Sequence, residues 1–260
     1  LSLHYYTVTG WTGSKGSATE FDTDVYYSTL GKCLEIEPVI ERHIDIMDEK
    51  DPQKKVGLMV DEWGTWFDEE PGSVPGHLFQ QNTMRDAMVA ALTLNVFHRH
   101  ADRVRMANIA QMANVLQAMW LTDGDKLVLT PTYYVFKMYR PHQDAVHIPL
   151  NVECDTIRDA NGRNVPTLAA TASRAYDGSV TITVTNPIIA TSAKVEIPLP
   201  EGVGRNIELA EILTAPDPHA RNTFERPDAV KTMPFKNAKV KGGKLIMELP
   251  GVSVASVRVK

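Results

Sequence analysis

The spacing of apolar residues changes near Asp123-Gly124-Asp125, and this change constrains the fold more than any other feature of the chain. Before it, short apolar runs alternate with segments of helical periodicity. After it, short runs with an apolar residue at every second position are separated by turn residues. The first pattern is typical of an α/β sheet of parallel strands, and the second is typical of an antiparallel β-sandwich. The sequence therefore predicts an α/β plus all-β protein with domains at 1–122 and 123–260.

The first domain is predicted to alternate strictly between strand and helix. Its expected elements are strand 1–6, helix 22–50 with a kink at Pro38, strand 56–60, helix 77–99, strand 104–109 and helix 112–119. The apolar run at 56–60 is typical of a parallel strand covered on both faces. The Gly/Ser/Thr-rich stretch Thr9–Thr19 predicts a mobile loop after the first strand. Together, these elements favour part of a (β/α)8 TIM barrel.

A closed barrel of this kind needs eight strand and helix units, and only three are predicted here. We therefore expect the chain to be the C-terminal part of a larger enzyme. The remaining strands are expected on a companion chain or segment, without which the open sheet edges would promote aggregation.

The second domain is predicted from short alternating runs and the turns between them. The runs are Val180–Val184, Lys194–Leu199, Leu245–Leu249 and Val252–Val259, and turn residues stand at 159–162, 177–178, 201–202 and 242–243. No acidic cluster converges at the ends of these strands. Asp217 and Glu225 are therefore expected to have structural rather than catalytic roles.

Charge and cysteine content exclude several classes of protein. A net charge of −5 without any Lys/Arg-rich block argues against a nucleic-acid or anionic-membrane partner. No apolar stretch approaches the roughly 18 residues that could span a membrane. Cys33 and Cys154 lie far apart, without the spacing of a zinc site, and are predicted to be free buried thiols.

The run from Val56 to Trp66 brings two carboxylates, Asp61 and Glu62, to the end of a predicted strand. Polar residues at the C-terminal ends of parallel strands are where α/β folds build active sites. Successive strand residues point to opposite faces, so one of the two carboxylates is expected to face the site. The alternative is a surface pair that merely ends the strand.

Four motifs, in order along nearly the whole chain, resemble the α-L-arabinofuranosidases of glycoside hydrolase family 51. They are Ser2-Leu3-His4-Tyr5-Tyr6, Asp61-Glu62-Trp63-Gly64 with Trp66, Met106–Gln117 and Leu213–Glu225. The resemblance implies a (β/α)8 barrel followed by a β-sandwich, with the present strands as the sixth, seventh and eighth. It also implies retaining, exo-acting release of terminal α-L-arabinofuranosyl groups by double displacement. The implied partner is an arabinofuranosyl oligosaccharide or polysaccharide, and a cytoplasmic homo-oligomer is expected.

The resemblance also implies roles for particular residues. Glu62 matches the nucleophile, whereas the acid/base glutamate of strand four has no counterpart here. Tyr6 matches the tyrosine whose hydroxyl lies against the nucleophile. Trp66 matches the aromatic at the rim of the furanose pocket, and Gln111 matches a glutamine that hydrogen-bonds the arabinose.

Other positions leave a structural alternative open. His4 is expected either to orient groups around the nucleophile or to be a buried, hydrogen-bonded histidine. Trp63 is expected to serve packing or the site. His98 and His100 are expected at a helix C-terminus, where they interact with the helix dipole, and no metal or cofactor is expected. Gly64-Thr65 departs from the commoner family pattern, which could reshape the edge of the pocket.

Two other functions remain open on the sequence. One is an endoglucanase or xylosidase of the same barrel superfamily. The other is a non-catalytic carbohydrate-binding protein that keeps a remnant of the barrel. Retention of Glu62 together with Tyr6 and Trp66 argues against the second.

Overall fold

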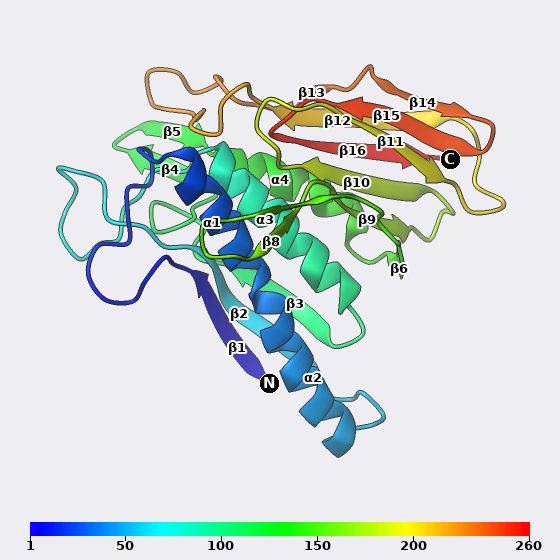
Figure 1. The fold of residues 1–260 in the computed structure, drawn as a ribbon, viewed down its shortest axis with the longest axis horizontal. Helices are drawn as coiled ribbons and strands as arrows, with labels where there is room; N and C mark the ends of the chain where they lie inside the picture. Colours follow the sequence, from blue (N-terminus) through cyan, green and yellow to red (C-terminus); the bar gives the residue numbers. More distant parts are fainter.

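The computed structural model describes residues 1–260 as a parallel sheet with helices, followed by layered antiparallel sheets (Figure 1). The first half runs in the order β1 Ser2–Thr7, α1 Thr23–Leu34, α2 Ile36–Lys50, β2 Leu58–Thr65, α3 Met84–Arg99 and β3 Val104–Ile109. The three strands form one sheet in the order β1-β2-β3, and both pairings are parallel. The predicted alternation of strands and helices is confirmed as far as the third strand.

Helices cover this sheet on one face only. Leu58, Val60 and Trp63 of β2 lie in a buried cluster with residues of α1 and α3. On β3, by contrast, Met106 is 45% exposed. The expectation of a strand covered on both faces is wrong within this chain. Right-handed connections between parallel strands of a curved sheet place successive helices on the same side. The helices of this chain therefore leave the other face of the sheet uncovered.

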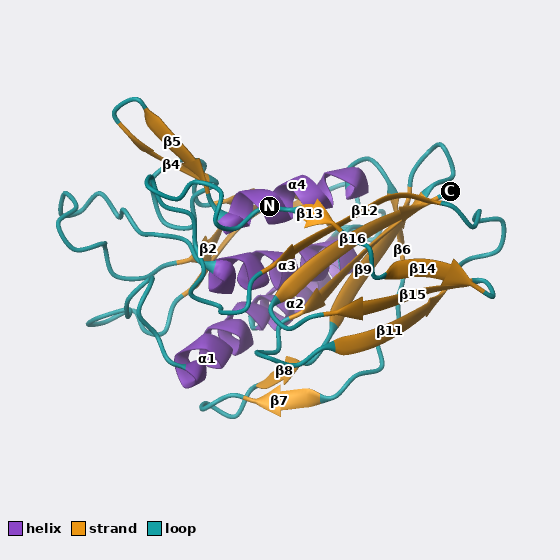
Figure 2. Cartoon of the chain, turned by 90° about the horizontal axis from the view of Figure 1, so that it is seen from above, coloured by secondary structure: helices purple, strands orange, loops and turns teal.

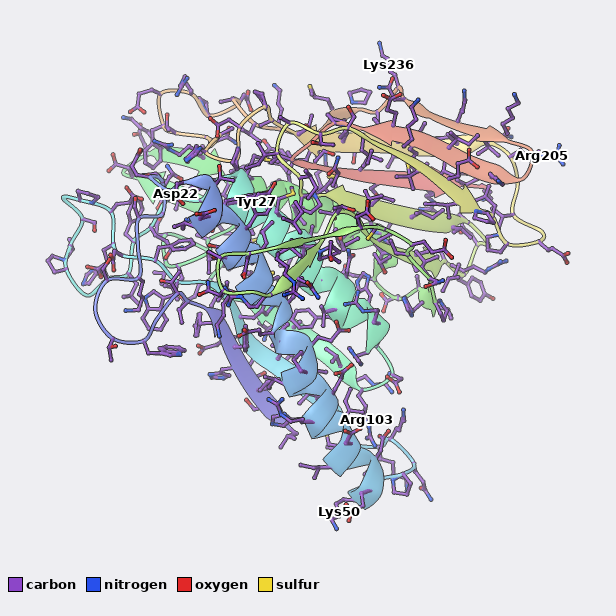
Figure 3. The ribbon with its side chains drawn as sticks, in the orientation of Figure 1. Asp22, Tyr27, Lys50, Arg103, Arg205 and Lys236 are labelled. Carbon is purple, nitrogen blue, oxygen red and sulfur yellow. The ribbon has the colours of Figure 1, made fainter.

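The expected helix 22–50 is two helices, separated at Glu35. Pro38 lacks an N–H, and its ring clashes with the carbonyl four residues earlier, which belongs to Leu34. Leu34 is the last residue of α1, so Pro38 causes the helix to end four residues before the proline. Beyond α2, the buried guanidinium of Arg103 binds Asp48 and Asp51 at 2.6 and 2.8 Å, which fixes this helix to the start of β3 (Figure 3).

The helix expected at 77–99 begins only at Met84. Thr83 and Asp86 form a capping box, in which the backbone N–H of Thr83 donates to Oδ2 of Asp86 at 2.7 Å. This reciprocal pair satisfies backbone groups that a helix leaves free in its first turn. The capping box therefore sets the start of α3, and residues 77–83 belong to the preceding loop.

The helix expected at 112–119 is absent. Asn114 and Leu116 adopt φ values of 61° and 53°, and Ala113 pairs with Trp120 as an isolated bridge. Positive φ angles cannot continue a right-handed helix. The segment instead leads into a hairpin of β4 Trp120–Asp123 and β5 Lys126–Leu129.

The second half begins with a helix and continues as antiparallel sheet (Figure 2). Its elements are α4 Pro131–Tyr139, the short 3₁₀ helix η1 Arg140–His142, β6 Val146–Ile148, β7 Thr156–Arg158, β8 Asn164–Pro166, β9 Ala169–Arg174, β10 Val180–Asn186, β11 Ala193–Pro198, β12 Ile207–Thr214, β13 Met233–Pro234, β14 Ala238–Lys241, β15 Lys244–Leu249 and β16 Ser253–Val259. The six-stranded sheet β13-β12-β16-β10-β9-β6 and the three-stranded sheet β11-β15-β14 share a second apolar cluster. The strands predicted from the four alternating runs are confirmed.

Helix α4 connects the two halves. Val135, Met138 and Tyr139 of this helix lie in the first cluster, beside residues of α3. Tyr139 also donates a hydrogen bond to Oδ1 of Asn95 in α3 at 2.7 Å. Helix α4 therefore packs on the α/β part of the molecule, although it lies beyond residue 122.

Two smaller expectations are also resolved by the structure. Cys33 is buried as predicted, whereas Cys154 is only half-buried, and both thiols are free. None of the helices combines the length and the apolar character needed to cross a lipid bilayer.

Two histidines with lowered pKa values, the half-buried His98 and the buried His142, predict a pH-dependent stability. Burial lowers the pKa of His98 to about 4 and that of His142 to about 3, against 6.5 for an ordinary histidine. The unfolded chain therefore binds more protons between about pH 6.5 and pH 4. Stability should be full above pH 6.5, and each histidine should cost about 2 kcal/mol on acidification to pH 5. Urea unfolding of the complete protein at pH 7 and pH 5 measures this loss.

A His142→Gln variant provides the control. Nδ1 and Nε2 of His142 lie 2.7 and 2.9 Å from the hydroxyls of Ser173 and Thr183, contacts that a neutral side chain can make. The variant should lose less stability than the wild type between the two pH values. An equal loss in both proteins would contradict the assignment.

Candidate active site

The face of the sheet that lacks helices carries three polar side chains side by side. Tyr5 of β1 points toward the helices, where its hydroxyl donates to the carbonyl of Lys32 at 2.7 Å. Because strand residues alternate, His4 and Tyr6 project from the opposite face. Glu62 of β2 is the register partner of His4. The sheet thus brings two residues of the first motif against the carboxylate of the second.

A β-bulge directs Glu62 to this face. Leu3 pairs with Val60 and His4 pairs with Glu62, so Asp61 is an extra residue in β2. Val60 and Trp63 both lie in the helix-facing cluster although they are three positions apart. Without the bulge, alternation would put Glu62 on the same face as Val60. The strand is also longer than predicted, because β2 continues to Thr65 and does not end at the two carboxylates.

Glu62 accepts a short hydrogen bond from Tyr6. The tyrosine hydroxyl lies 2.6 Å from Oε2 of Glu62, while Oε1 accepts no hydrogen bond in the structure. Burial and the hydrogen bond to Glu62 raise the pKa of Tyr6 well above its ordinary value, so the hydroxyl stays protonated. Nδ1 of His4 lies 3.7 Å from the same Oε2, too far for a hydrogen bond. His4 is therefore an exposed neighbour of the carboxylate rather than a buried histidine.

Trp66 completes this group at the end of β2. Its ring meets that of Tyr6 edge to face, with centroids 5.1 Å apart. Trp11 makes a second edge-to-face contact with Trp66 at 5.9 Å, and Nζ of Lys15 lies 5.3 Å from the same ring. Sequence reasoning missed Trp11 and Lys15. A lone tryptophan in a polar loop, directly after the strand that carries Tyr6, is the signal that could have found them.

The loop that carries Trp11, predicted to be mobile, makes hydrogen bonds with neighbouring segments. Asp68 accepts hydrogen bonds from the hydroxyl of Ser14 and from the backbone of Lys15. The buried guanidinium of Arg85 donates to the carbonyls of Ser17 and Ala18 at 3.2 and 3.1 Å. These hydrogen bonds join the loop to the segment that follows β2 and to the first turn of α3.

Arg85 also lies between two aromatic rings. Its guanidinium carbon is 3.9 Å from the ring centre of Phe21 and 3.8 Å from that of Phe67. His219, from the second half, stacks on the other face of Phe21 at 4.0 Å. Asp217 contacts His219 and not the carboxylate of Glu62, in keeping with a structural role.

The remaining candidate residues do not join the group. Gln111 is exposed in the irregular segment after β3, and its side chain makes no hydrogen bond in the structure. Trp63 is 1% exposed and packs against Phe97 and Phe136, so it belongs to the core. Asp61 makes no side-chain hydrogen bond or ion pair. Of the five site residues predicted from the sequence, the structure brings together Glu62, Tyr6, Trp66 and His4.

The structure explains the residue types at Gly64 and Thr65, which lie at the edge of the site. Gly64 adopts a φ of +136°, and a Cβ there would meet Gln117 at 3.1 Å. The hydroxyl of Thr65 donates to Oδ1 of the buried Asp86 at 2.6 Å. The hydrogen bond between Thr65 and Asp86 therefore anchors the end of β2 to the start of α3.

The histidines expected at the helix C-terminus have other partners. His98 is half-buried and neutral at physiological pH, and its Nδ1 lies 3.0 Å from the hydroxyl of Thr171. His100 contacts Glu37, and together with Glu41 these residues form a group with metal-ligand atom types. Arg99 already binds both carboxylate oxygens of Glu37. Both carboxylate oxygens of Glu37 are therefore engaged by Arg99, and this group lies at the ends of helices α2 and α3, away from Glu62.

Comparison with known proteins gives consistent matches along the chain. The sequence model of the family described as "Alpha-L-arabinofuranosidase C-terminal domain" matches residues 61–253. An "Intracellular exo-alpha-L-arabinofuranosidase" of Bacteroides ovatus is 50% identical over 260 residues, which is 100% of this chain and 50% of that protein. An "Intracellular exo-alpha-(1->5)-L-arabinofuranosidase" of Streptomyces lividans is 26% identical over 249 residues, covering 89% of this chain and 37% of that protein.

A solved structure is similar over the same extent. The GH51 arabinofuranosidase from Xanthomonas axonopodis pv. citri matches with a TM-score of 0.95 and 46% identity. The match covers 100% of this chain and 52% of that one. The chain thus spans about half the length of the proteins that it resembles.

Proposed function

The chain belongs to the α-L-arabinofuranosidases of glycoside hydrolase family 51, as their C-terminal region, and on that premise we propose what it does. Together with the segment that supplies the rest of the enzyme, it releases terminal α-L-arabinofuranosyl groups from arabinose-containing oligosaccharides or polysaccharides. The reaction is exo-acting and retains the anomeric configuration. The observation that carries this proposal is the 2.6 Å hydrogen bond between Tyr6 and Glu62 on the face without helices.

The geometry of Glu62 suits a nucleophile. Tyr6 engages Oε2, which leaves Oε1 free to attack the anomeric carbon. In the first step, the bond from Oε1 to this carbon forms as the bond to the leaving oxygen breaks. A second carboxyl about 5–5.5 Å away must protonate the leaving oxygen and then activate the water that releases the arabinose. No other carboxylate of this chain contacts Glu62, so this acid/base is assigned to the companion segment.

The aromatic residues give the site its sugar-binding character. An indole face suits the apolar C–H face of a furanose ring, and Trp66 stands beside Tyr6 at the end of β2. His4 completes the polar side, where it lies opposite the carboxylate and is open to solvent. We assign Gln111 to the arabinose hydroxyls on the strength of the family motif alone.

The same premise extends to the architecture. We propose that β1, β2 and β3 are strands six, seven and eight of a (β/α)8 barrel, and that residues 123–260 form the β-sandwich that follows the barrel domain at 1–122. The parallel order and one-sided helical cover support this reading. The word "Intracellular" in the names of the two relatives supports a cytoplasmic location.

Hydrolysis of 4-nitrophenyl α-L-arabinofuranoside by the complete enzyme tests the proposal directly. We expect release of nitrophenol together with α-L-arabinofuranose as the first product. Hydrolysis of a 4-nitrophenyl β-xyloside or of an internal glucan bond, but not of the arabinoside, would favour a different glycosidase of the superfamily. Absence of activity on all three would favour a binding protein.

Replacement of Tyr6 by phenylalanine should lower kcat by about 10–100-fold. The variant loses a hydrogen bond to a charged group, which is worth about 1.5–3 kcal/mol, at the oxygen beside the attacking one. KM should change little, because the hydroxyl contacts the nucleophile rather than the substrate. Steady-state kinetics with the arabinoside measure both constants.

Tyr5→Phe is the matched control for this variant. Tyr5 is the adjacent residue of β1, but its hydroxyl bonds the carbonyl of Lys32 on the helical face. Its loss should lower stability slightly and leave kcat within about twofold. Equal effects of both substitutions on kcat would remove Tyr6 from the site.

A further inference from the structure

The chain at the end of β2 extends past the end of β3, and this segment carries Trp66. The last register pair between the two strands joins Trp63 with Ile109, whereas β2 continues to Thr65. Successive residues of a strand direct their backbone N–H groups alternately to the two neighbouring strands. On one side, the N–H of Trp66 donates to the carbonyl of Thr7, in β1, at 3.1 Å. On the other side β3 has ended, so the next N–H groups need acceptors from elsewhere.

Two buried glutamine side chains supply these acceptors. Oε1 of Gln117 accepts the backbone N–H of Thr65 at 2.8 Å. Oε1 of Gln80 accepts the backbone N–H of Phe67 at 2.9 Å. Both glutamines are 0% exposed, and a buried N–H without a partner would cost free energy. The two amides thus continue the hydrogen-bond ladder of the sheet, and they fix the backbone on both sides of Trp66.

The amide of Gln117 is itself held by two helices. Its Nε2 donates to the carbonyl of Asp86 in α3 at 2.8 Å and to the hydroxyl of Thr132 in α4 at 3.2 Å. These helices lie side by side (Figures 1 and 2). A backbone N–H only donates and a backbone carbonyl only accepts, so these partners fix which end of the amide faces β2. The side chain of Gln117 therefore connects the end of this strand with both helices.

The backbone of Gln117 holds a second segment of the site. Its N–H donates to the carbonyl of Ala110 at 2.9 Å, and Ala110 directly precedes Gln111. The N–H of Ala110 in turn donates to the carbonyl of Trp63 at 2.9 Å. Gln111 is the residue that the family motif assigns to the arabinose hydroxyls. Gln117 therefore binds both of the segments that carry Trp66 and Gln111.

The glycine at position 64, part of the pair that departs from the commoner family pattern, lets Gln117 approach the strand. A Cβ at Gly64 would meet the Cβ of Gln117 at 3.1 Å and its Oε1 at 3.2 Å. A larger residue would push the amide away from the N–H of Thr65. Close approach of another group to the backbone is a position that glycine suits. The departure at Gly64 thus belongs with the contact between Gln117 and β2.

We propose that Gln117 is a positioning residue for the arabinose pocket beside Glu62, where it holds Trp66 and Gln111 in the geometry that binds the sugar. The proposal rests on the proposed function, because it takes these two residues as contacts of the arabinose. Glu62 itself is held by the hydroxyl of Tyr6. Sugar contacts that are equal in the ground state and the transition state change KM rather than kcat. Gln117 therefore acts on the binding of the sugar.

Replacement of Gln117 by methionine removes the amide at nearly unchanged volume. In the complete enzyme, KM for 4-nitrophenyl α-L-arabinofuranoside should rise about tenfold, and kcat should stay within about threefold. The inhibition constant of free L-arabinose should rise by the same factor as KM. Thr132→Val is the milder variant, because it removes one partner of the Gln117 amide and leaves β2 untouched. It should raise both constants about threefold.

Asn186→Leu is the matched control, because Asn186 is a buried amide of β10 that also bonds backbone groups. Its Nδ2 donates to the carbonyl of Thr191 at 2.8 Å, and its Oδ1 accepts the N–H of Ile188 at 3.1 Å. This variant should lose stability in urea, as Gln117→Met should, but leave KM and the inhibition constant unchanged.

A lower stability of Gln117→Met with both constants unchanged would overturn the proposal, since it would show a role in folding alone. If Gln117→Met does not fold, the same two constants of Thr132→Val decide, and wild-type values would overturn the proposal. Failure of the wild type to hydrolyse the arabinoside would instead overturn the proposed function.

Discussion

Replacement of Glu62 by alanine in the complete enzyme is expected to lower kcat by about four to six orders of magnitude. The reason is that no covalent glycosyl intermediate can form without the carboxylate whose Oε1 is free beside the Tyr6 hydrogen bond. Release of nitrophenol from the aryl arabinoside measures this loss. Folding should be retained, because the side chain of Glu62 is 44% exposed and its truncation leaves no buried cavity.

Azide should restore part of the activity of this variant. The small anion fits the space that the carboxylate vacates and attacks the anomeric carbon once. The product should therefore be an arabinosyl azide with inverted configuration, which nuclear magnetic resonance of the product can identify. Rescue with an inverted product distinguishes a missing nucleophile from a misfolded site.

Asp61→Asn is the matched control for Glu62→Ala. Asp61 is the extra residue of the bulge and makes no side-chain hydrogen bond or ion pair. Its loss of charge should change kcat by a few-fold at most. Near wild-type activity of Glu62→Ala, or a large loss of activity in Asp61→Asn, would contradict the assignment of Glu62 as the nucleophile.

The 260-residue chain expressed without its companion segment should show no measurable turnover. Retaining hydrolysis needs two carboxyls, and the structure brings only Glu62 to the face without helices. The same face leaves Met106 45% exposed, and the sheet ends in the unpaired edges of β1 and β3. Exposed edges of this kind promote association between copies, so the isolated chain should also aggregate.

Coexpression of the companion segment should restore both solubility and activity. Size-exclusion chromatography and the aryl arabinoside assay, applied to the chain alone and to the pair, measure the two effects. Substitution of the acid/base glutamate on the companion should abolish the restored activity but not the solubility. A monomeric and active isolated chain would contradict the proposed division of the site.

Much of the fold follows from local sequence signals. The strand at β3, the turns at 177–178 and 242–243, and the alternating runs of the second half depend on residues within a few positions of one another. Their periodicity and turn chemistry act locally, so a single sequence is enough to predict them. Where the predicted helix boundaries differ from those in the structure, the causes are local as well. Pro38 ends α1 four residues upstream of itself, and the capping box at Thr83 delays the start of α3.

The candidate site was predicted from motifs, whereas its arrangement depends on contacts between distant segments. Residue types identified Glu62, Tyr6, Trp66 and His4. Which face Glu62 occupies depends on the bulge at Asp61, and the bulge exists only in the pairing of β2 with β1. Trp11 reaches Trp66 because Asp68 and Arg85 hold its loop, and neither contact leaves a periodic trace in the sequence.

The sequence by itself therefore determined the two halves of the chain and the residue types at the ends of the parallel strands. Local periodicity and turn preferences carry that information. Only the tertiary structure decided the one-sided helical cover, the orientation of Glu62 and the place of Trp11. These features depend on register and packing between segments far apart along the chain, where the free energy of many weak contacts outweighs local preference.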